Sequence, residues 1–259
     1  MQAATRLPQA SAESTSKLAH EIGPTSFYFI AANAPRNLMD NQAPLPSLHD
    51  LLTEHPEWVV VQTFDLAGAV SGKYKDTFAS VSHRWENKVQ PDPDGQQLQA
   101  VRALLMERPN VQYVWYDYWC MYQGAGITDA QKAERAMMMK RINLLYLGCT
   151  VFVLSDQQYL GRFWTLMEFW MAMQLCTAAG LSGTEGMKGT RRWIIRVLGA
   201  AQAAGDKHEQ SLIEMMRNKT PDEAREVLAQ QDILVTNQSD KDLHLGLLSK
   251  LSGEVREAF

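Results

Sequence analysis

From residue 77 to the C-terminus, short apolar segments alternate with longer amphipathic ones, and this alternation restricts the possible folds more than any other feature. The expected strands are 77–83, 111–117, 150–155, 191–199 and 232–237, and the expected helices are 96–108, 129–148, 162–173, 208–217, 220–230 and a last one after 239. Strands that alternate with helices imply parallel strands joined by crossover helices. Apolar strands fit a sheet that is covered on both faces. The sequence therefore predicts an α/β fold, a flavodoxin-like doubly wound parallel sheet of about five strands in the order 2-1-3-4-5.

The N-terminal part lacks this alternation. Residues 1–46 are rich in Ala, Ser, Gln, Asn and Pro and contain one apolar patch, at 27–32. We expect an irregular N-terminal arm over 1–46, whose patch docks on the body, and one α/β domain over 47–259. Ser47 has the position of an N-cap for a short helix over 48–55, and a strand is expected at 57–64.

Composition narrows the possible partners and the compartment. The net charge of −4 and the isoelectric point near 5.9 disfavour nucleic acid, whose binding needs a basic face. No apolar run reaches the length of a membrane span, and the N-terminus lacks the apolar centre of a signal peptide. The three cysteines are odd in number and widely spaced. They predict reduced thiols and a cytoplasmic protein.

Polar and aromatic residues follow the carboxyl ends of the first three expected strands. In doubly wound sheets, ligands bind outside these ends, where the strand order reverses. The residues that would meet there are Ser82, His83, Arg84 and Trp85, then Asp117, Tyr118, Trp119, Cys120 and Gln123, then Ser155, Asp156, Tyr159, Arg162, Trp164 and Glu168. The sequence thus predicts a cleft for a ligand that carries flat rings and hydroxyl groups.

Glu168 stands out among these residues because it is the only charged residue between Arg162 and Glu185. On a helix its neighbours three and four positions away are uncharged, so the carboxylate should lose hydration and its pKa should rise. A desolvated carboxylate is costly for the fold, so we expect it to have either a charged or hydrogen-bonding partner or a function. Two interpretations remain open, a structural ion pair with Arg162 or Arg141, and a functional carboxylate.

Three segments resemble the conserved blocks of the fungal heterokaryon-incompatibility (HET) domain, in family order. They are "FASVSHRW" at 78–85, "VWYDYWCMYQ" at 114–123 and "RFWTLME" at 162–168, and the resemblance covers about residues 77–175. His83 and Tyr116 depart from the family pattern, as does the Met121-Tyr122 pair. The HET domain is related to the TIR domain, a parallel five-stranded sheet in which a glutamate after the third strand cleaves NAD in the enzymatic members.

The resemblance implies a function and assigns roles. Glu168 stands where the catalytic glutamate would be, and the implied activity is that of an NAD glycohydrolase in an immune, cell-death or signalling response. Its product would be ADP-ribose or a cyclic variant. NAD would be the substrate, no cofactor is expected, and TIR-like contacts would form a homo-oligomer. The residues expected to bind the substrate are Ser82, His83, Arg84, Trp85, Asp117, Trp119, Cys120, Gln123, Arg162 and Trp164. Among them, Trp85, Trp119 and Trp164 would wall the base, and Arg84 or Arg162 would hold the diphosphate. Asp117 would bond a ribose hydroxyl, orient Arg84 or only cap its loop.

Other classes remain as alternatives. Cys120 with His83 as its base would make a nucleophilic hydrolase. A metal site of His83, Glu86, Asp117 and Cys120 lacks a tight ligand spacing, so no metal is expected. The more serious alternative is a non-enzymatic module whose strand ends bind a nucleotide signal or a partner domain. Trp115 and Trp170 are expected in the core.

Overall fold

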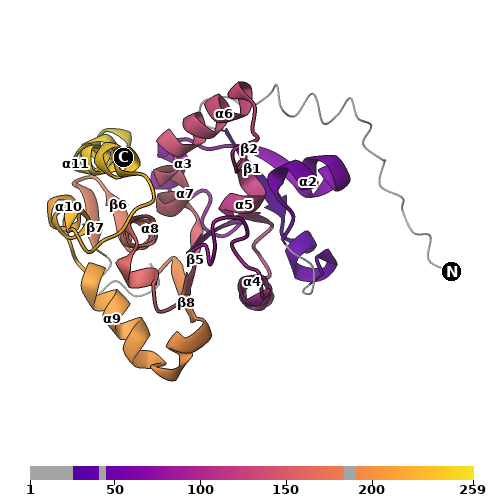
Figure 1. Cartoon of the computed structure of the whole chain (residues 1–259). Helices are drawn as coiled ribbons and strands as arrows, with labels where there is room; N and C mark the ends of the chain where they lie inside the picture. Colours follow the sequence, from indigo (N-terminus) through magenta and orange to yellow (C-terminus); the bar gives the residue numbers. More distant parts are fainter. Residues whose placement is uncertain (1–25, 41–44, 184–190) are drawn as a thin grey trace.

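A computed structural model describes residues 26–40, 45–183 and 191–259, and its centre is a six-stranded sheet in the order β2-β1-β4-β3-β5-β8 (Figure 1). These strands are β1 (Ser26–Ala31), β2 (Val59–Thr63), β3 (Phe78–His83), β4 (Tyr113–Trp115), β5 (Thr150–Ser155) and β8 (Trp193–Val197). The last four are parallel to one another, whereas β1 runs antiparallel to both β2 and β4. The chain therefore has an α/β fold with a mostly parallel sheet, consistent with a doubly wound arrangement.

The strand count and the complete strand order differ from the prediction. The first four expected strands form β3, β4, β5 and β8, and their neighbours follow the predicted order 2-1-3-4. The fifth expected strand, 232–237, is not part of the sheet. Leu234 instead makes an isolated bridge with Arg162, in which Leu234 N donates to Gly161 O at 2.8 Å and Phe163 N donates to Leu234 O at 2.9 Å. This segment fastens the start of a helix, so its backbone is not free to extend a sheet edge.

The sheet gains two strands at its other side. The expectation of an irregular arm is wrong for residues 26–31, which form the buried strand β1 between β2 and β4. The rings of Phe29 and Phe64 stack with centroids 5.3 Å apart, and Phe78 packs edge-on against both. Burying this aromatic cluster stabilises the strand in the sheet. The rest of the expected arm lies partly outside the described residues, which begin at 26 and omit 41–44.

Helices cover both faces of the sheet. On one face α8 (Phe163–Ala172) packs on β3 and β5, and α9 (Asp206–Met216) packs on β8 (Figure 1). On the other face α4 (Gln96–Glu107) packs on β5. Helix α4 begins after Gly95, whose φ of 69° is easily reached only by glycine. The carboxylate of Asp92 accepts hydrogen bonds from the backbone N–H groups of Gln97 and Leu98, which fixes this helix start.

The remaining elements surround these layers. They are η1 (Ala34–Leu38), α2 (Leu48–Glu54), η2 (Pro56–Trp58), α3 (Leu66–Val70), α5 (Asp117–Cys120), α6 (Asp129–Lys140), α7 (Asn143–Gly148), η3 (Tyr159–Gly161), the hairpin strands β6 (Gln174–Thr177) and β7 (Gly180–Gly183), η4 (Gly199–Ala203), α10 (Pro221–Ala229) and α11 (Gln238–Ala258). Ser47 is the N-cap of helix α2, as predicted, and it also forms a capping box with Asp50. The single helix expected over 129–148 is two helices, because the chain breaks at Arg141 and Ile142 between α6 and α7.

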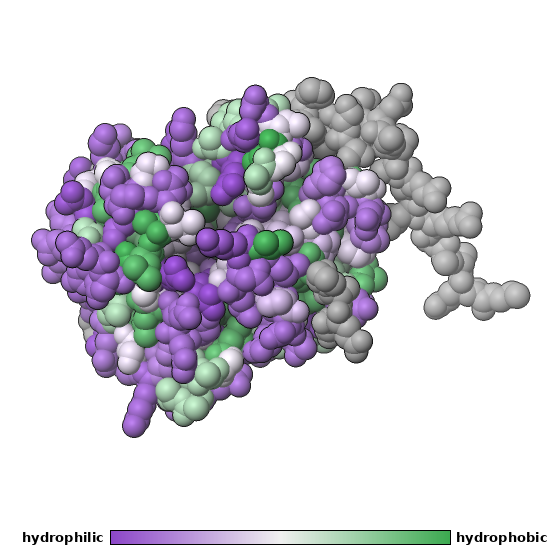
Figure 2. Space-filling view, viewed as in Figure 1, coloured by the Kyte–Doolittle hydropathy of each residue, from purple (hydrophilic) through white to green (hydrophobic). Residues whose placement is uncertain are grey.

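The surface is mainly polar on the face shown in Figure 2, where hydrophobic residues form small separate groups among hydrophilic ones. Within the described ranges, no helix combines the length and the apolar character that crossing a membrane requires.

Candidate functional site

The side chain of Glu168 lies on α8 beneath the carboxyl ends of β3 and β5, and only 8% of the residue is exposed. Ser82 Oγ, from the end of β3, donates a hydrogen bond to Glu168 Oε2 at 2.7 Å. The same Oγ lies 2.5 Å from the hydroxyl of Tyr159 in η3, which donates to Thr165 O at 3.1 Å. Side chains alternate along a strand, so Ser82 faces α8 while the next residue faces the other way. Strand β3 therefore presents Ser82 to the carboxyl group of Glu168.

Burial dominates the ionisation of this carboxyl group. Loss of hydration raises the pKa of Glu168 from 4.5 to about 8, the hydrogen bonds of Ser82 and Tyr146 oppose the rise, and the negative charge of Asp117 adds to it. None of the ion pairs found among residues 26–40, 45–183 and 191–259 includes Glu168. The structural ion pair with Arg162 or Arg141 is thus not formed in this part of the chain.

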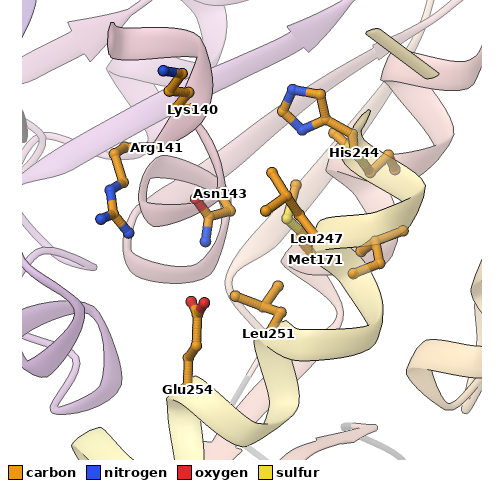
Figure 3. Close-up of a pocket in the computed structure, with 10 residues that line it drawn as sticks. Lys140, Arg141, Asn143, Met171, His244, Leu247, Leu251 and Glu254 are labelled. Atoms are coloured by element: carbon orange, nitrogen blue, oxygen red, sulfur yellow. The ribbon is translucent and has the colours of Figure 1, made fainter. Parts of the chain in front are cut away.

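Arg141 lies elsewhere. It lines a small cavity of about 50 Å³ between the turn after α6 and the helix α11, together with Asn143 and Glu254 (Figure 3). Figure 3 shows Arg141 and Glu254 reaching into this space from opposite sides. Such a volume holds only a few water molecules. This cavity is therefore too small for an organic substrate.

Asp117 organises a second group of side chains, at the end of β4. Its Oδ1 lies 2.9 Å from His83 Nε2, and its Oδ2 accepts a hydrogen bond from Trp85 Nε1 at 2.7 Å. Gln123 Nε2 donates to the backbone carbonyl of Asp117 at 3.3 Å. The ring of His83 stacks on Tyr116 with centroids 4.1 Å apart. Asp117 thus holds His83 and Trp85 in place.

Arg84 does not pair with Asp117. Its Nε and Nη2 donate to Asp156 Oδ2 at 2.8 and 2.5 Å, and its Nη1 donates to Trp85 O at 2.6 Å. Arg84 follows β3 and Asp156 follows β5, so this ion pair bridges the ends of two neighbouring strands. It borders a polar cleft of about 200 Å³. The lining residues are Arg84, Glu86, Gln96, Gln97, Leu154, Asp156, Gln157, Gln158, Leu198, Gly199 and Ala200.

Two of the expected substrate-binding residues lie in the core. Trp119 and Cys120 are 0% exposed, and the ring of Trp119 packs on Tyr116. Cys120 Sγ donates a weak hydrogen bond to Val114 O at 3.7 Å, and burial raises the pKa of the thiol. Neither side chain offers a surface to a substrate in this structure, because both are fully buried. Trp115 and Trp170 are also buried, as expected for core residues.

The other two predicted residues lie on or beside α8. Arg162 is half-buried and occupies the N-cap position of the helix. Trp164 is half-buried one turn before Glu168, on the same side of the helix. Its ring packs edge-on against Phe163 and against His244 of α11, with centroids 5.6 and 4.7 Å away. Trp164 is therefore placed as a wall near the carboxyl group, and α11 supports it.

Sequence reasoning missed Tyr146 of α7 as a member of the site. It is 1% exposed, its hydroxyl donates to Val81 O at 3.2 Å, and it lies close enough to Glu168 to oppose the rise in the pKa of that carboxyl group. Nothing in the apolar pattern of α7 distinguishes this tyrosine from a packing residue. Only the crossing of α7 and α8 brings it to Glu168.

The described residues contain no group of three or more His, Cys, Asp and Glu side chains that is able to hold a metal ion, so the four-residue metal site considered above is not assembled there. A scan against protein-family models and searches of curated proteins and of solved structures find no match for this chain. The class that the fold and the site define is an α/β protein with a mostly parallel sheet, whose polar side chains gather at the carboxyl ends of β3, β4 and β5.

Proposed function

We propose that this protein is an NAD glycohydrolase of the TIR/HET-like type, with Glu168 as its catalytic carboxylate. One observation carries the proposal. Glu168 is a buried carboxyl group with no ion-pair partner among the described residues, and Ser82 holds it at the strand ends where doubly wound sheets bind ligands. A desolvated carboxyl group with a perturbed pKa is costly for the fold and typical of active sites.

The reaction requires a carboxylate and does not depend on a general acid. Cleavage of the bond between nicotinamide and ribose C1′ leaves a cationic, oxocarbenium-like sugar, as glycoside hydrolysis does. Nicotinamide departs as a neutral molecule with the bonding electron pair. Water then bonds to C1′ and releases a proton, which gives ADP-ribose. Ionised Glu168 stabilises the positive charge that develops on the sugar, in a site with little water.

The protonation state of Glu168 fits this role. With its pKa near 8, most of the free protein carries a neutral Glu168 at pH 7. The pyridinium ring of NAD is positively charged, so its binding favours loss of that proton. Substrate binding thereby produces the carboxylate that the reaction uses, and Ser82 remains bonded to it. Trp164 and Trp85 are the aromatic walls for the bound rings. His244 supports Trp164, and Asp117 orients Trp85.

The wider setting is also part of the proposal. The sequence resemblance implies the TIR-like flavodoxin fold, activity in a homo-oligomer and a role in an immune, cell-death or signalling response. The cytoplasmic location is proposed from the odd number and wide spacing of the cysteines. The four parallel strands and the position of Glu168 after β5 support this assignment. Nucleophilic hydrolysis by Cys120 loses support, because a fully buried thiol with a raised pKa is a poor nucleophile.

The test is the release of free nicotinamide from NAD by concentrated protein, compared between the wild type and Glu168→Gln. We expect the rate to fall by about two to three powers of ten, since the charge supplies about 3–4 kcal/mol at the transition state. Glu134→Gln is the matched control, because Glu134 is also a buried glutamate whose pKa burial raises, but it lies on α6. The control should keep full activity.

A non-enzymatic nucleotide-binding module is the second candidate. The full burial of Ser82 and the 8% exposure of Glu168 favour it, because a substrate reaches this carboxyl group only if the site opens. If wild-type protein binds NAD but releases no nicotinamide, this second function replaces the first. Full activity in Glu168→Gln would instead remove Glu168 from the chemistry.

A further inference from the structure

The polar cleft beside Arg84 lies at the switch point of the sheet. Strand β3 has β4 on one side and β5 on the other, so the connections leave β3 and β5 in opposite directions. The crevice outside their carboxyl ends is the usual ligand site of such sheets. Glu168 occupies the side of this crevice under α8. The cleft of about 200 Å³ occupies the side of α4, whose first residues Gln96 and Gln97 line it.

The charges of the cleft disfavour a phosphate group. Arg84 is the only cationic side chain among its lining residues, and Asp156 already binds two of its N–H groups. Glu86 adds a second carboxylate. Partial loss of hydration raises its pKa, Asp92 and Asp94 add to the rise, and a hydrogen bond from Gln97 and the charge of Arg84 oppose it. With one cation against two carboxylates, an anion would gain little and would repel Glu86.

The same groups suit neutral hydroxyl groups. A guanidinium has five N–H donors, and the bonds to Asp156 and Trp85 use three of those of Arg84. The rest are available as donors, while the carboxylate of Glu86 and the side-chain amides of Gln96, Gln157 and Gln158 accept or donate. Two neighbouring hydroxyls of a sugar need such a mixture of donors and acceptors. Drug-sized ligands occupy roughly 300–1,000 Å³, so this smaller cleft suits one sugar ring.

We propose that this cleft binds the ribose of the adenosine half of NAD through its 2′ and 3′ hydroxyl groups. The inference rests on the proposed function, since it places the nicotinamide ribose at Glu168. Ser82 precedes Arg84 by two residues, and Tyr159 follows Asp156 by three, so the chain at the ends of β3 and β5 borders both subsites. One dinucleotide therefore spans the ends of β3 and β5, with one ribose at Glu168 and the other in the cleft.

Blocking the cleft tests the inference. Ala200 is exposed and lines the cleft, so Ala200→Trp fills it without removing a hydrogen bond. Ala203→Trp is the matched control, because Ala203 is exposed in the same short helix η4 but is not among the lining residues. We expect adenosine to bind the full chain at least tenfold more weakly in Ala200→Trp and unchanged in Ala203→Trp. In the wild type, 2′,3′-dideoxyadenosine should bind at least tenfold more weakly than adenosine. Equal binding of the two nucleosides, or equal binding by the two variants, overturns the inference.

A second variant guards against a folding defect of Ala200→Trp. Glu86→Ala removes an acceptor from an exposed residue and should weaken adenosine binding in the same direction, while melting temperatures report the fold. Nicotinamide release separates this inference from the proposed function. With Ala200→Trp, KM should rise at least tenfold for NAD and stay unchanged for nicotinamide mononucleotide, which lacks the adenosine half. Unchanged KM for NAD refutes the cleft assignment alone. Absence of nicotinamide release in the wild type refutes the glycohydrolase, and the adenosine measurements then still decide the cleft.

Discussion

At the scale of single residues, the protonation of Glu168 determines how its neighbours are bonded. An ionised Glu168 accepts from Ser82 Oγ, which lies 2.7 Å away. A protonated Glu168 donates to Ser82 instead, and Ser82 then donates to the hydroxyl of Tyr159, which donates to Thr165 O. The second arrangement satisfies every hydroxyl in the chain of bonds. The free protein thus accommodates the neutral form without an unpaired polar group.

The first prediction at this scale concerns the pH dependence of nicotinamide release. Because the reactive form is the carboxylate, kcat/KM should rise with pH and level off above about 8, the pKa of Glu168 in the free protein. Ser82→Ala removes a hydrogen bond that lowers this pKa, so its profile should shift to higher pH. Ser80→Ala is the control, since Ser80 is buried two residues earlier on the same strand and its Oγ has no partner in the part of the chain that the structure describes. An unchanged pH profile in Ser82→Ala would show that this hydrogen bond does not influence the pKa that governs the reaction.

The second prediction concerns stability. The pKa of Glu168 is higher in the folded chain than in the unfolded one, so the folded state binds more protons between pH 4.5 and about 8. The contribution of protonated Glu168 to the free energy of unfolding is therefore complete below pH 4.5 and is lost as the pH rises through 8. The loss is of the order of 4–5 kcal/mol. Glu168→Gln cannot ionise, so its melting temperature relative to wild type should rise by roughly 10 °C between pH 5 and pH 8.5. A constant difference across this range would contradict the raised pKa.

At the scale of elements, Arg192 ties together the two helices that supply the site. Its Nη1 donates to Tyr146 O and Cys149 O at the end of α7, at 3.1 and 2.7 Å. Its Nη2 donates to Met171 O near the end of α8 at 3.3 Å and to Gln174 O at the start of β6 at 3.2 Å. The last carbonyls of a helix lack partners within it, and they carry partial negative charge. One guanidinium therefore fixes how α7 presents Tyr146 to α8.

The third prediction follows from these bonds. Arg192→Met leaves four carbonyl groups without their donor and should lower the free energy of unfolding by about 3–5 kcal/mol, measured by urea denaturation. Arg191→Met is the matched control. Arg191 stacks on Trp193 at 3.6 Å and pairs with Glu209 at an exposed position, so its loss should cost no more than about 1 kcal/mol. Similar losses in both variants would show that the carbonyl contacts contribute little.

At the scale of the whole molecule, the N-terminal strand completes the core. β1 lies inside the sheet, and Phe27, Tyr28, Phe29 and Ile30 are each 0% exposed. It joins β2 to the parallel strands, so the sheet has antiparallel pairing at one side and parallel pairing at the other. Residues 26–31 therefore belong to the folding unit and are more than part of an appended arm.

The fourth prediction tests this role. Phe29→Ala removes a fully buried ring from the cluster with Phe64 and Phe78 and should destabilise the protein by about 3–5 kcal/mol in urea denaturation. Leu38→Ala, in the same N-terminal segment, changes a side chain that is 52% exposed and should stay within about 0.5 kcal/mol. A small effect of Phe29→Ala would mean that β1 is dispensable for the fold.

The sequence by itself determined the α/β class, the first four parallel strands and their neighbours, and most helices, because periodicity and capping are local properties. It also singled out Glu168, since an isolated charge in an apolar helix is visible in the sequence, and Ser82, since it stands at the carboxyl end of an expected strand. It did not determine that β1 enters the sheet or that 232–237 stays out, because edge pairing depends on which segments compete for the same backbone groups. Likewise, only the tertiary structure decided that Arg84 forms its ion pair with Asp156, that Trp119 and Cys120 lie in the core, and that Tyr146 lies close to Glu168. Those contacts join residues far apart in the chain, and their partners are set by how helices cross the sheet, for which no local pattern carries a signal.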